Sequence, residues 1–389
     1  MSALSAGVQR EELVEAEQQV SPLELFFDLV FVFAITQVTT FIAHGATWTA
    51  LFEGLAILSA LWFAWESYVW LANRAASDEG PMRVVLLAAM GALLIASLAV
   101  PRAFGDDGLV FGVAYFAVRA MHLVAFRIVA RDDPDLQRVI GRLATTIVPA
   151  AALIVVAGAL DGTAQALCWI AALSIDYGGL VVRGVEGWRV VAGHFAERHG
   201  LVIIIALGES IVSVGVGVGA LDLDAGIITA ALLGIAVASA MWWAYFDVVA
   251  RVAERRLRAA PPDEQVRIAR DSYTYLHLPM VTGIVLFALG IKKLLGHVDA
   301  DLDAVPATAL CVGPAMYFLA LSAFKRRNIG SFNQPRLVAA IVLVVLAPVT
   351  TGIPALVALA LVALVCCALI GYESVRYAEA RDRIRHGAG

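Results

Sequence analysis

The chain has 389 residues, of which 61% are hydrophobic and 16% are charged, and its mean hydropathy is +0.82. Soluble domains average about 45–50% apolar and about 25% charged residues, so a single soluble core could not bury this much apolar surface. The composition therefore predicts an integral membrane protein whose main partner is the lipid bilayer. The chain has a formal net charge of −5, and its basic residues are scattered over many short segments. This distribution argues against a nucleic-acid partner.

The N-terminal segment is acidic. Residues 1–20 carry four glutamates and no apolar core, which predicts that the chain has no cleavable signal peptide. The first span would then act as its own insertion signal.

Apolar runs long enough to cross a bilayer follow one another along the rest of the chain. A spanning helix needs about 20 mostly apolar residues. Twelve segments meet this requirement: 23–43, 50–72, 83–100, 108–130, 140–159, 164–183, 200–219, 225–249, 273–295, 304–324, 336–351 and 353–372. They are too continuously apolar for the alternating strands of a barrel. The predicted fold is all-α, a polytopic transmembrane helical bundle of about twelve spans.

The distribution of positive charge predicts the orientation. With the N-terminus in the cytoplasm, 24 of the 28 lysines and arginines lie in cytoplasmic segments, three lie outside, and Arg119 lies within a span. Cytoplasmic loops of membrane proteins carry this excess of positive charge. Both termini are therefore predicted to be cytoplasmic, in a multipass protein of the cell membrane.

Three patterns of the first six spans recur, in order, six spans later. The matching pairs are 62–66 with 242–247, 142–148 with 336–342, and 172–177 with 368–372. Because six is even, the repeats would have the same orientation, as in some secondary transporters. The predicted organisation is a tail at 1–22, a first half at 23–183, a second half at 184–372 with a basic cytoplasmic loop at 251–271, and a tail at 373–389.

Polar side chains within the spans are the candidates for function, since an ionisable group at mid-membrane costs roughly 2.5–3.5 kcal/mol or more. The candidate substrate- or ion-binding residues are Asp28, Glu209, Arg119, His122, His277, Asp247, Glu66, Asp176, Glu24, Gln37 and Ser210.

The first span opens with two carboxylates on one face. Glu24 and Asp28 are four residues apart, and Ser21 followed by Pro22 predicts a capped helix start. An interfacial helix start explains Glu24 well. It explains Asp28 less well, because that residue lies a turn deeper, so a functional and a structural role both stay open for it.

Glu209 lies near the middle of the seventh span, with Ser210 beside it and Ser213 one turn on. No helix end accounts for a carboxylate at this depth. This arrangement favours a proton or cation site, and the alternative is a static contact with a base on another helix.

Arg119 and His122 share one face of the fourth span. An arginine cannot give up its charge, so Arg119 needs a carboxylate or a wet cavity. Its candidate partners are Glu209, Asp28, Glu66 and Asp176. Carboxylates outnumber bases in the spans, so some would be protonated, and such an excess is a requirement of proton coupling.

The histidines predict no metal site and no cofactor. His277, two residues before Pro279, is more typical of a structural hydrogen-bonding residue than of a ligand. His194 and His199 flank Glu197, but this spacing lacks a second helical histidine at metal-binding distance.

Four segments resemble the low temperature requirement protein A (LtrA) family. Residues 21–37, SPLELFFDLVFVFAITQ, resemble its opening signature, and 197–210, ERHGLVIIIALGES, resemble its second signature. Residues 242–247 and 275–280 are also similar, and the resemblance covers about 20–375. It implies a protein of the bacterial inner membrane and implies no particular reaction. The residues that it marks are Glu24, Asp28, Glu209, Asp247 and His277.

Three functions agree with these features. The first is a secondary transporter coupled to protons or cations. The second is an intramembrane enzyme acting on a lipid or prenyl-type substrate, in which Arg119 would hold a phosphate. The third is a non-catalytic envelope or stress-response protein. The buried carboxylates and the apparent repeat favour the transporter, and an enzymatic activity stays open.

Overall fold

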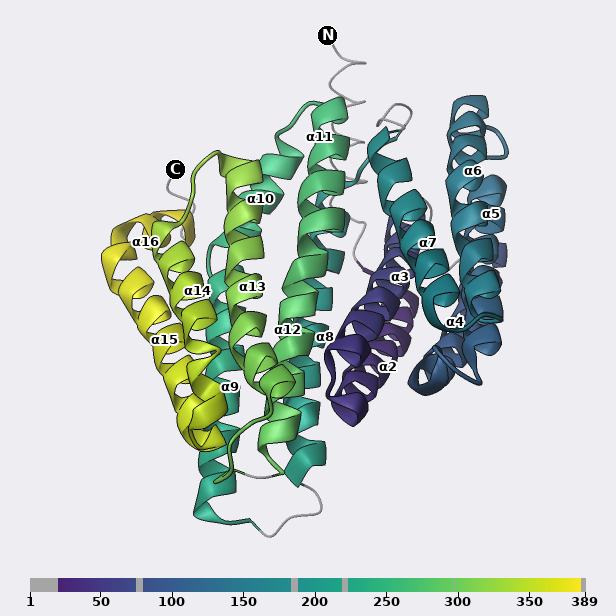
Figure 1. Cartoon of the computed structure of the whole chain (residues 1–389). Helices are drawn as coiled ribbons and strands as arrows, with labels where there is room; N and C mark the ends of the chain where they lie inside the picture. Colours follow the sequence, from purple (N-terminus) through teal and green to yellow (C-terminus); the bar gives the residue numbers. More distant parts are fainter. Residues whose placement is uncertain (1–19, 75–79, 183–187, 219–222, 297, 386–389) are drawn as a thin grey trace. The chain divides into compact units, whose positions relative to one another are not determined.

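The computed structural model describes residues 20–74, 80–182, 188–218, 223–296 and 298–385 (Figure 1). Most of the predicted N-terminal tail, 1–22, therefore lies outside the described residues. The helices are α2 (Pro22–Gly45), α3 (Trp48–Ala72), α4 (Gly80–Ala99), η1 (Val100–Arg102), α5 (Gly108–Val129), α6 (Pro134–Ala157), α7 (Gly162–Val182), α8 (Ala192–Val218), α9 (Ala225–Phe246), α10 (Val249–Arg258), α11 (Pro262–Ile268), η2 (Ala269–Tyr275), α12 (Leu276–Leu294), α13 (Ala304–Ile329), α14 (Gln334–Leu346), η3 (Val349–Gly352), α15 (Ala355–Arg376) and α16 (Ala378–Arg385).

The helices confirm the predicted fold class. In the described part of the chain, twelve helical stretches are long and apolar enough to cross a membrane, and each overlaps one predicted span. β-structure there is limited to one isolated bridge between Asp301 and Pro354. Helices are expected, because a backbone in lipid must satisfy its hydrogen bonds within its own segment.

Two helix boundaries differ from the prediction in ways that affect the candidate site. Helix α8 begins at Ala192, so the segment that precedes 200 is helical rather than a loop. The predicted loop at 251–271 is also largely helical, since α10, α11 and the π-helix η2 occupy most of it. Pro261 and Pro262 separate α10 from α11, and Pro262 occupies the first turn of α11, where its missing N–H is tolerated.

The chain divides into two compact units. The first comprises the described residues within Met1–Ala34, Ser59–Leu201 and Glu254–Arg270, and the second those within Ile35–Leu58, Val202–Ala253 and Asp271–Gly389. These boundaries pass through α2, α3, α8, α10 and η2, whereas the predicted halves meet between spans. The parallel six-plus-six repeat stays a prediction.

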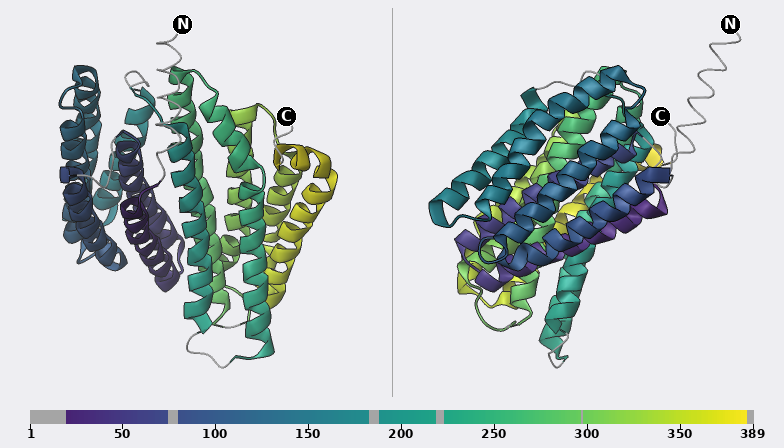
Figure 2. Two further views of the ribbon diagram at one scale, coloured as in Figure 1. Left: turned by 180° about the vertical axis from the view of Figure 1, so that it is seen from behind. Right: turned by 90° about the vertical axis from the view of Figure 1, so that its right-hand side faces the viewer.

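Within the first unit, α4, α5, α6 and α7 pack in succession, each against the next (Figure 2). Glycines allow α5 and α6 to approach at the level of their backbones. A Cβ atom on Gly112 would lie 2.7 Å from the Cα of Val155, and one on Gly158 would lie 2.2 Å from the carbonyl oxygen of Gly108.

Within the second unit, α12 and α13 run side by side in contact over much of their length (Figure 1). Gly283 and Gly313 face each other at this crossing, where a Cβ on Gly283 would lie 2.5 Å from the carbonyl oxygen of Gly313. Helix α13 also packs on α14, and α15 packs on α9. Small residues give such interfaces their close backbone approach.

Candidate functional site

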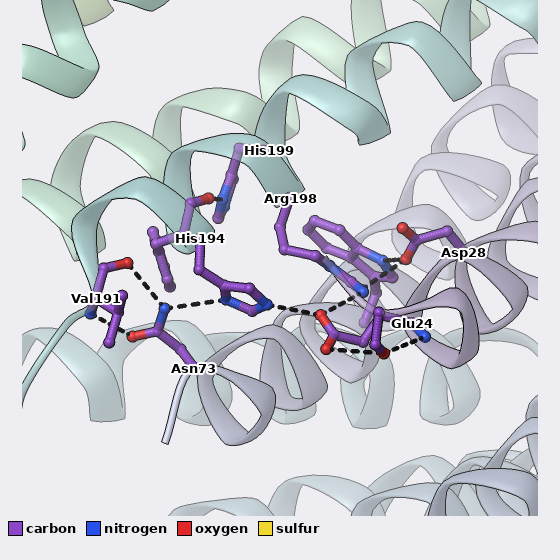
Figure 3. Close-up of polar contacts among 10 residues, drawn as sticks. Glu24, Asp28, Asn73, Val191, His194, Arg198 and His199 are labelled. Carbon is purple, nitrogen blue, oxygen red and sulfur yellow. Dashed lines mark hydrogen bonds and ion pairs between the residues drawn. The ribbon is translucent and has the colours of Figure 1, made fainter. Parts of the chain in front are cut away.

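Arg198 is the centre of a buried cluster of charges in the first unit (Figure 3). Its Nη1 donates to Glu24 Oε2 at 3.0 Å, and its Nη2 donates to Asp28 Oδ1 at 2.7 Å. His194, one turn earlier on α8, lies 2.9 Å from Glu24 Oε2 through its Nε2. Two i,i+4 pairs therefore face each other, carboxylates on α2 and bases on α8. We call the group around Arg198, completed by the residues below, the Arg198 cluster.

Asp28 is held from a second side by Trp65 of α3. The indole Nε1 donates to Asp28 Oδ1 at 2.8 Å, and the Arg198 guanidinium lies 5.7 Å from the centre of the Trp65 ring. Asp28 is fully buried, and Arg198 is 1% exposed. The second oxygen of Asp28, Oδ2, accepts no hydrogen bond from the residues that the structure describes.

The hydrogen bonds of Asn73 determine the position of the proton on His194. Asn73 Oδ1 accepts from the backbone N–H of Val191 at 2.8 Å, so its Nδ2 is the atom that faces His194 Nδ1 at 3.2 Å. Nδ2 can only donate, so Nδ1 of His194 accepts, and the ring proton lies on Nε2 and is donated to Glu24. His194 therefore fits this site as a neutral ring.

His199 and Glu66 form a second buried pair. His199 Nδ1 lies 2.8 Å from the carbonyl oxygen of Phe195, so this nitrogen donates. His199 Nε2 lies 2.7 Å from Glu66 Oε1, and one further proton must lie between these atoms, either on the imidazole or on the carboxyl. Both residues are at most 2% exposed. The pair as a whole is neutral in either arrangement.

Two buried carboxylates share the guanidinium of Arg198. Glu24 and Asp28 both accept hydrogen bonds from this permanent cation, and Glu24 also accepts one from His194. All of these side chains are buried, so the contacts replace hydrogen bonds that water would otherwise make.

Glu209 occupies a separate polar site in the second unit. Its Oε2 accepts from Thr36 Oγ1 at 2.5 Å, and its Oε1 accepts from Ser213 Oγ at 3.1 Å. Glu209 is 1% exposed, and no base among the described residues lies within salt-bridge distance of it. The predicted alternative of a static ion pair at Glu209 is therefore not what the structure shows.

Lys292 supplies positive charge near Glu209. Its Nζ donates to Thr40 Oγ1 at 2.8 Å, and Thr40 in turn donates to the carbonyl oxygen of Thr36 at 2.8 Å. The ammonium group is close enough to attract the Glu209 carboxylate electrostatically. The positive-charge count assigns Lys292 to the outer side, at the end of the predicted span 273–295, and α12, which extends to Leu294, includes it.

Arg119 is paired with Asp176, one of its predicted candidates. Arg119 Nη2 donates to Asp176 Oδ1 at 2.7 Å, and its Nη1 donates to the carbonyl oxygen of Phe63 and to Ser67 Oγ. His122 packs edge-on against Tyr68 and Phe126, and its ring nitrogens have no hydrogen-bond partner in the described part of the chain.

Three further candidates are His277, Asp247 and Gln37, and the first two contact residues that belong neither to the Arg198 cluster nor to the Glu209 site. His277 Nε2 lies 2.9 Å from the Tyr245 hydroxyl, and its Nδ1 lies 3.1 Å from the carbonyl oxygen of Ser272, which is the arrangement of a structural hydrogen-bonding residue. Asp247 forms an ion pair with Arg381. Gln37 is half-buried.

Ser210 lines a pocket of about 150 Å³ in the second unit, whose other walls are aliphatic side chains, glycine and Phe287. Its hydroxyl accepts or donates no hydrogen bond within the described residues. Searched over those same residues, the structure contains no group of three or more histidine, cysteine and acidic side chains placed to hold a metal ion.

The basic half of the Arg198 cluster lies outside the span that the sequence predicts. That span begins at 200, because the continuous apolar run starts only at Leu201, so His194, Arg198 and His199 are expected at the inner interface before it. The signal that could have identified them is their spacing. His194 and Arg198 are four residues apart, as are Glu24 and Asp28, so two helices offer complementary faces.

Comparisons with known proteins agree with these motifs. A family model described as bacterial low temperature requirement A protein (LtrA) matches residues 19–371. An uncharacterised protein of Rhizobium meliloti is 31% identical over 288 residues, which cover 70% of this chain and 69% of the relative. No solved structure matches the chain. The matched range includes both the Arg198 cluster and Glu209, so this multipass membrane protein belongs to the bacterial LtrA family.

Proposed function

We propose that this protein is a secondary transporter that couples the movement of a small solute to protons. The observation that carries the proposal is Glu209, a buried carboxyl group held by the hydroxyls of Thr36 and Ser213 without a salt bridge to any described base. A carboxyl with hydroxyl partners can gain or lose a proton without breaking an ion pair. A membrane-embedded carboxyl of this kind is typical of proton pathways.

The surroundings of Glu209 favour a proton over a metal cation. The ammonium group of Lys292 donates to Thr40, which lies one turn of α2 from the Thr36 that contacts Glu209, and would repel a second cation. Protonation of Glu209 removes its charge and leaves the hydroxyl contacts in place.

The two alternative functions fit the site less well. An enzyme acting on a prenyl-type diphosphate would need Arg119 available for phosphate, but both of its Nη atoms are engaged, with Asp176, Phe63 and Ser67. In a purely structural protein, the buried carboxyl of Glu209 would not add to stability. An apolar side chain at this position would avoid the free-energy cost of removing the carboxyl from water.

We further propose that the protein lies in the bacterial cytoplasmic membrane with both termini in the cytoplasm. The proposal is supported by the excess of lysine and arginine in alternate connecting segments and by the even number of spans.

Proton coupling is tested in proteoliposomes that contain a pH-sensitive dye. Panels of amino acids, sugars, organic acids and cations are added in turn, and we expect at least one solute class to drive proton movement. The Glu209→Gln variant keeps the shape of the side chain, and its amide can still bond both hydroxyls if one of them accepts instead of donating. It cannot titrate, so proton movement should stop.

The matched control is Glu53→Gln, the same exchange at a half-buried glutamate on α3. Proton movement should persist in this variant. Unchanged proton movement in Glu209→Gln would show that Glu209 is not the coupling site. Absence of proton movement from the parent protein with every solute class would contradict the transporter itself.

A further inference from the structure

A pocket of about 380 Å³, with both charged and apolar side chains in its walls, lies in the second unit, and Glu209 does not line it. Its walls come from the end of α9, from α10, from the adjoining ends of α13 and α14, and from α15 and α16. Nothing in the transport proposal uses this pocket.

The pocket contains more positive than negative charge. Lys325, Arg336 and Arg381 line it, against the carboxylates of Asp247 and Glu373. Arg381 pairs with Asp247, and Arg336 pairs with Glu373. Lys325 forms no salt bridge within the described residues, so the pocket has one cation in excess.

Arg336 retains hydrogen-bonding capacity after these contacts. Its Nε and Nη2 each donate to Glu373 at 2.9 Å, and Nη2 also donates to the carbonyl oxygen of Ala244 at 3.2 Å. Its Nη1 has no partner in the described part of the chain, although the side chain is only 5% exposed. A buried guanidinium nitrogen without a hydrogen-bond acceptor is costly in free energy. An anionic ligand at this position would supply the missing acceptor.

The start of helix α14 adds to the positive potential. Asn333 caps this helix by accepting the backbone N–H of Arg336 at 3.3 Å, and it also donates to Glu373 Oε1 at 2.7 Å. Helix N-termini carry a partial positive charge and often bind phosphate groups. The Arg336 guanidinium, the Lys325 ammonium and this helix end therefore converge on one pocket.

The rim of the pocket is apolar and aromatic. Trp243, Phe332 and Tyr377 are 40%, 49% and 40% exposed, and all three line the pocket. Aromatic and basic side chains at the ends of spans are typical of the membrane–water interface. A ligand that suits both parts has an anionic head and an apolar body.

We propose that this pocket binds a phosphate group, most naturally the headgroup phosphate of an anionic phospholipid. Basic pockets between transmembrane helices bind such headgroups. The phosphate would accept from Arg336 Nη1 and from Lys325, while the acyl chains would lie along the apolar rim. Inorganic phosphate shares the same chemistry and is the soluble alternative.

The test uses purified full-length protein in a neutral detergent. Thermal unfolding is followed during titration with phosphatidylglycerol, phosphatidylcholine or inorganic phosphate. Phosphatidylglycerol should raise the unfolding temperature to a plateau as the lipid concentration increases, and phosphatidylcholine should leave the unfolding temperature unchanged. Stabilisation by inorganic phosphate as well would support the phosphate site with a soluble source, whereas stabilisation by phosphatidylglycerol alone would support the lipid.

Lys325→Gln tests the location without disturbing the buried Arg336–Glu373 pair. We expect the apparent affinity for phosphatidylglycerol to fall about tenfold, because one charge-assisted hydrogen bond is lost. The matched control is Lys293→Gln, which changes a lysine at the end of α12 that does not line the pocket. The affinity of this variant for phosphatidylglycerol should equal that of the parent protein. Equal affinities for both variants, or no stabilisation by either phosphate source, would overturn the proposal.

Discussion

Glu24 has both a local role and a long-range role. Its backbone N–H donates to Ser21 Oγ at 3.2 Å and its carboxylate accepts from the same hydroxyl, which confirms the predicted capped start of α2. The other carboxylate oxygen accepts from His194 and from Arg198. A residue placed at a helix start for local reasons therefore also belongs to a contact between segments 170 residues apart.

Arg198 is the residue whose loss we expect to cost most in stability. Arg198→Ala would leave Glu24 and Asp28 without their shared cation, and removing one partner of a buried ion pair typically costs about 3–5 kcal/mol. The midpoint of thermal unfolding in detergent should fall strongly. The control is Arg138→Ala, whose ion pair with Asp135 is 75% exposed on both sides, and here the midpoint should hardly move. Similar midpoints for the two variants would mean that the Arg198 contacts contribute little.

The α12–α13 contact shows how the size of a side chain controls helix packing. At Gly283 any Cβ atom would meet backbone atoms of α13, which cannot turn aside as the tip of a long side chain can. At Gly371 on α15, by contrast, no heavy atom of the described residues lies within 4 Å of the Cβ position. The same exchange at these two glycines should therefore have opposite effects.

Gly283→Ala should destabilise the protein by about 1–3 kcal/mol, because the helices must separate or bend to admit one methyl group. Gly371→Ala should leave stability unchanged or raise it by about 0.5–1 kcal/mol, since alanine favours a helix over glycine. Unfolding in increasing denaturant, followed by circular dichroism, measures both effects. An unchanged midpoint for Gly283→Ala would contradict the close approach of α12 and α13.

The positions of the connecting segments test the topology of the whole molecule. Asp106 lies between η1 and α5, and Arg131 lies between α5 and α6, so a spanning α5 places them on opposite sides of the membrane. In a background without the four native cysteines, Asp106→Cys should react with an impermeant maleimide in intact cells. Arg131→Cys should react only after the membrane is made permeable. The reverse pattern would invert the proposed orientation, and labelling of both in intact cells would contradict a spanning α5.

The sequence by itself determined the helical class, the twelve spans and the family, and it marked Glu24, Asp28, Glu66 and Glu209 as candidates. Hydropathy is a property summed over about 20 neighbouring residues, so a span can be recognised without knowing what it packs against. The cap at Ser21 is equally local and was predicted correctly.

Only the tertiary structure decided which charges meet. The sequence left four candidate partners for Arg119, and the structure selects Asp176. Local hydropathy began the seventh span at 200 and so left Arg198 outside it, and it predicted no partner for Lys292, near the end of the span 273–295. The structure puts Arg198 between Glu24 and Asp28, and Lys292 against Thr40. The partners lie on helices that are far apart in the sequence, and their pairing depends on how these helices pack. Hydropathy summed over neighbouring residues carries no information about that packing.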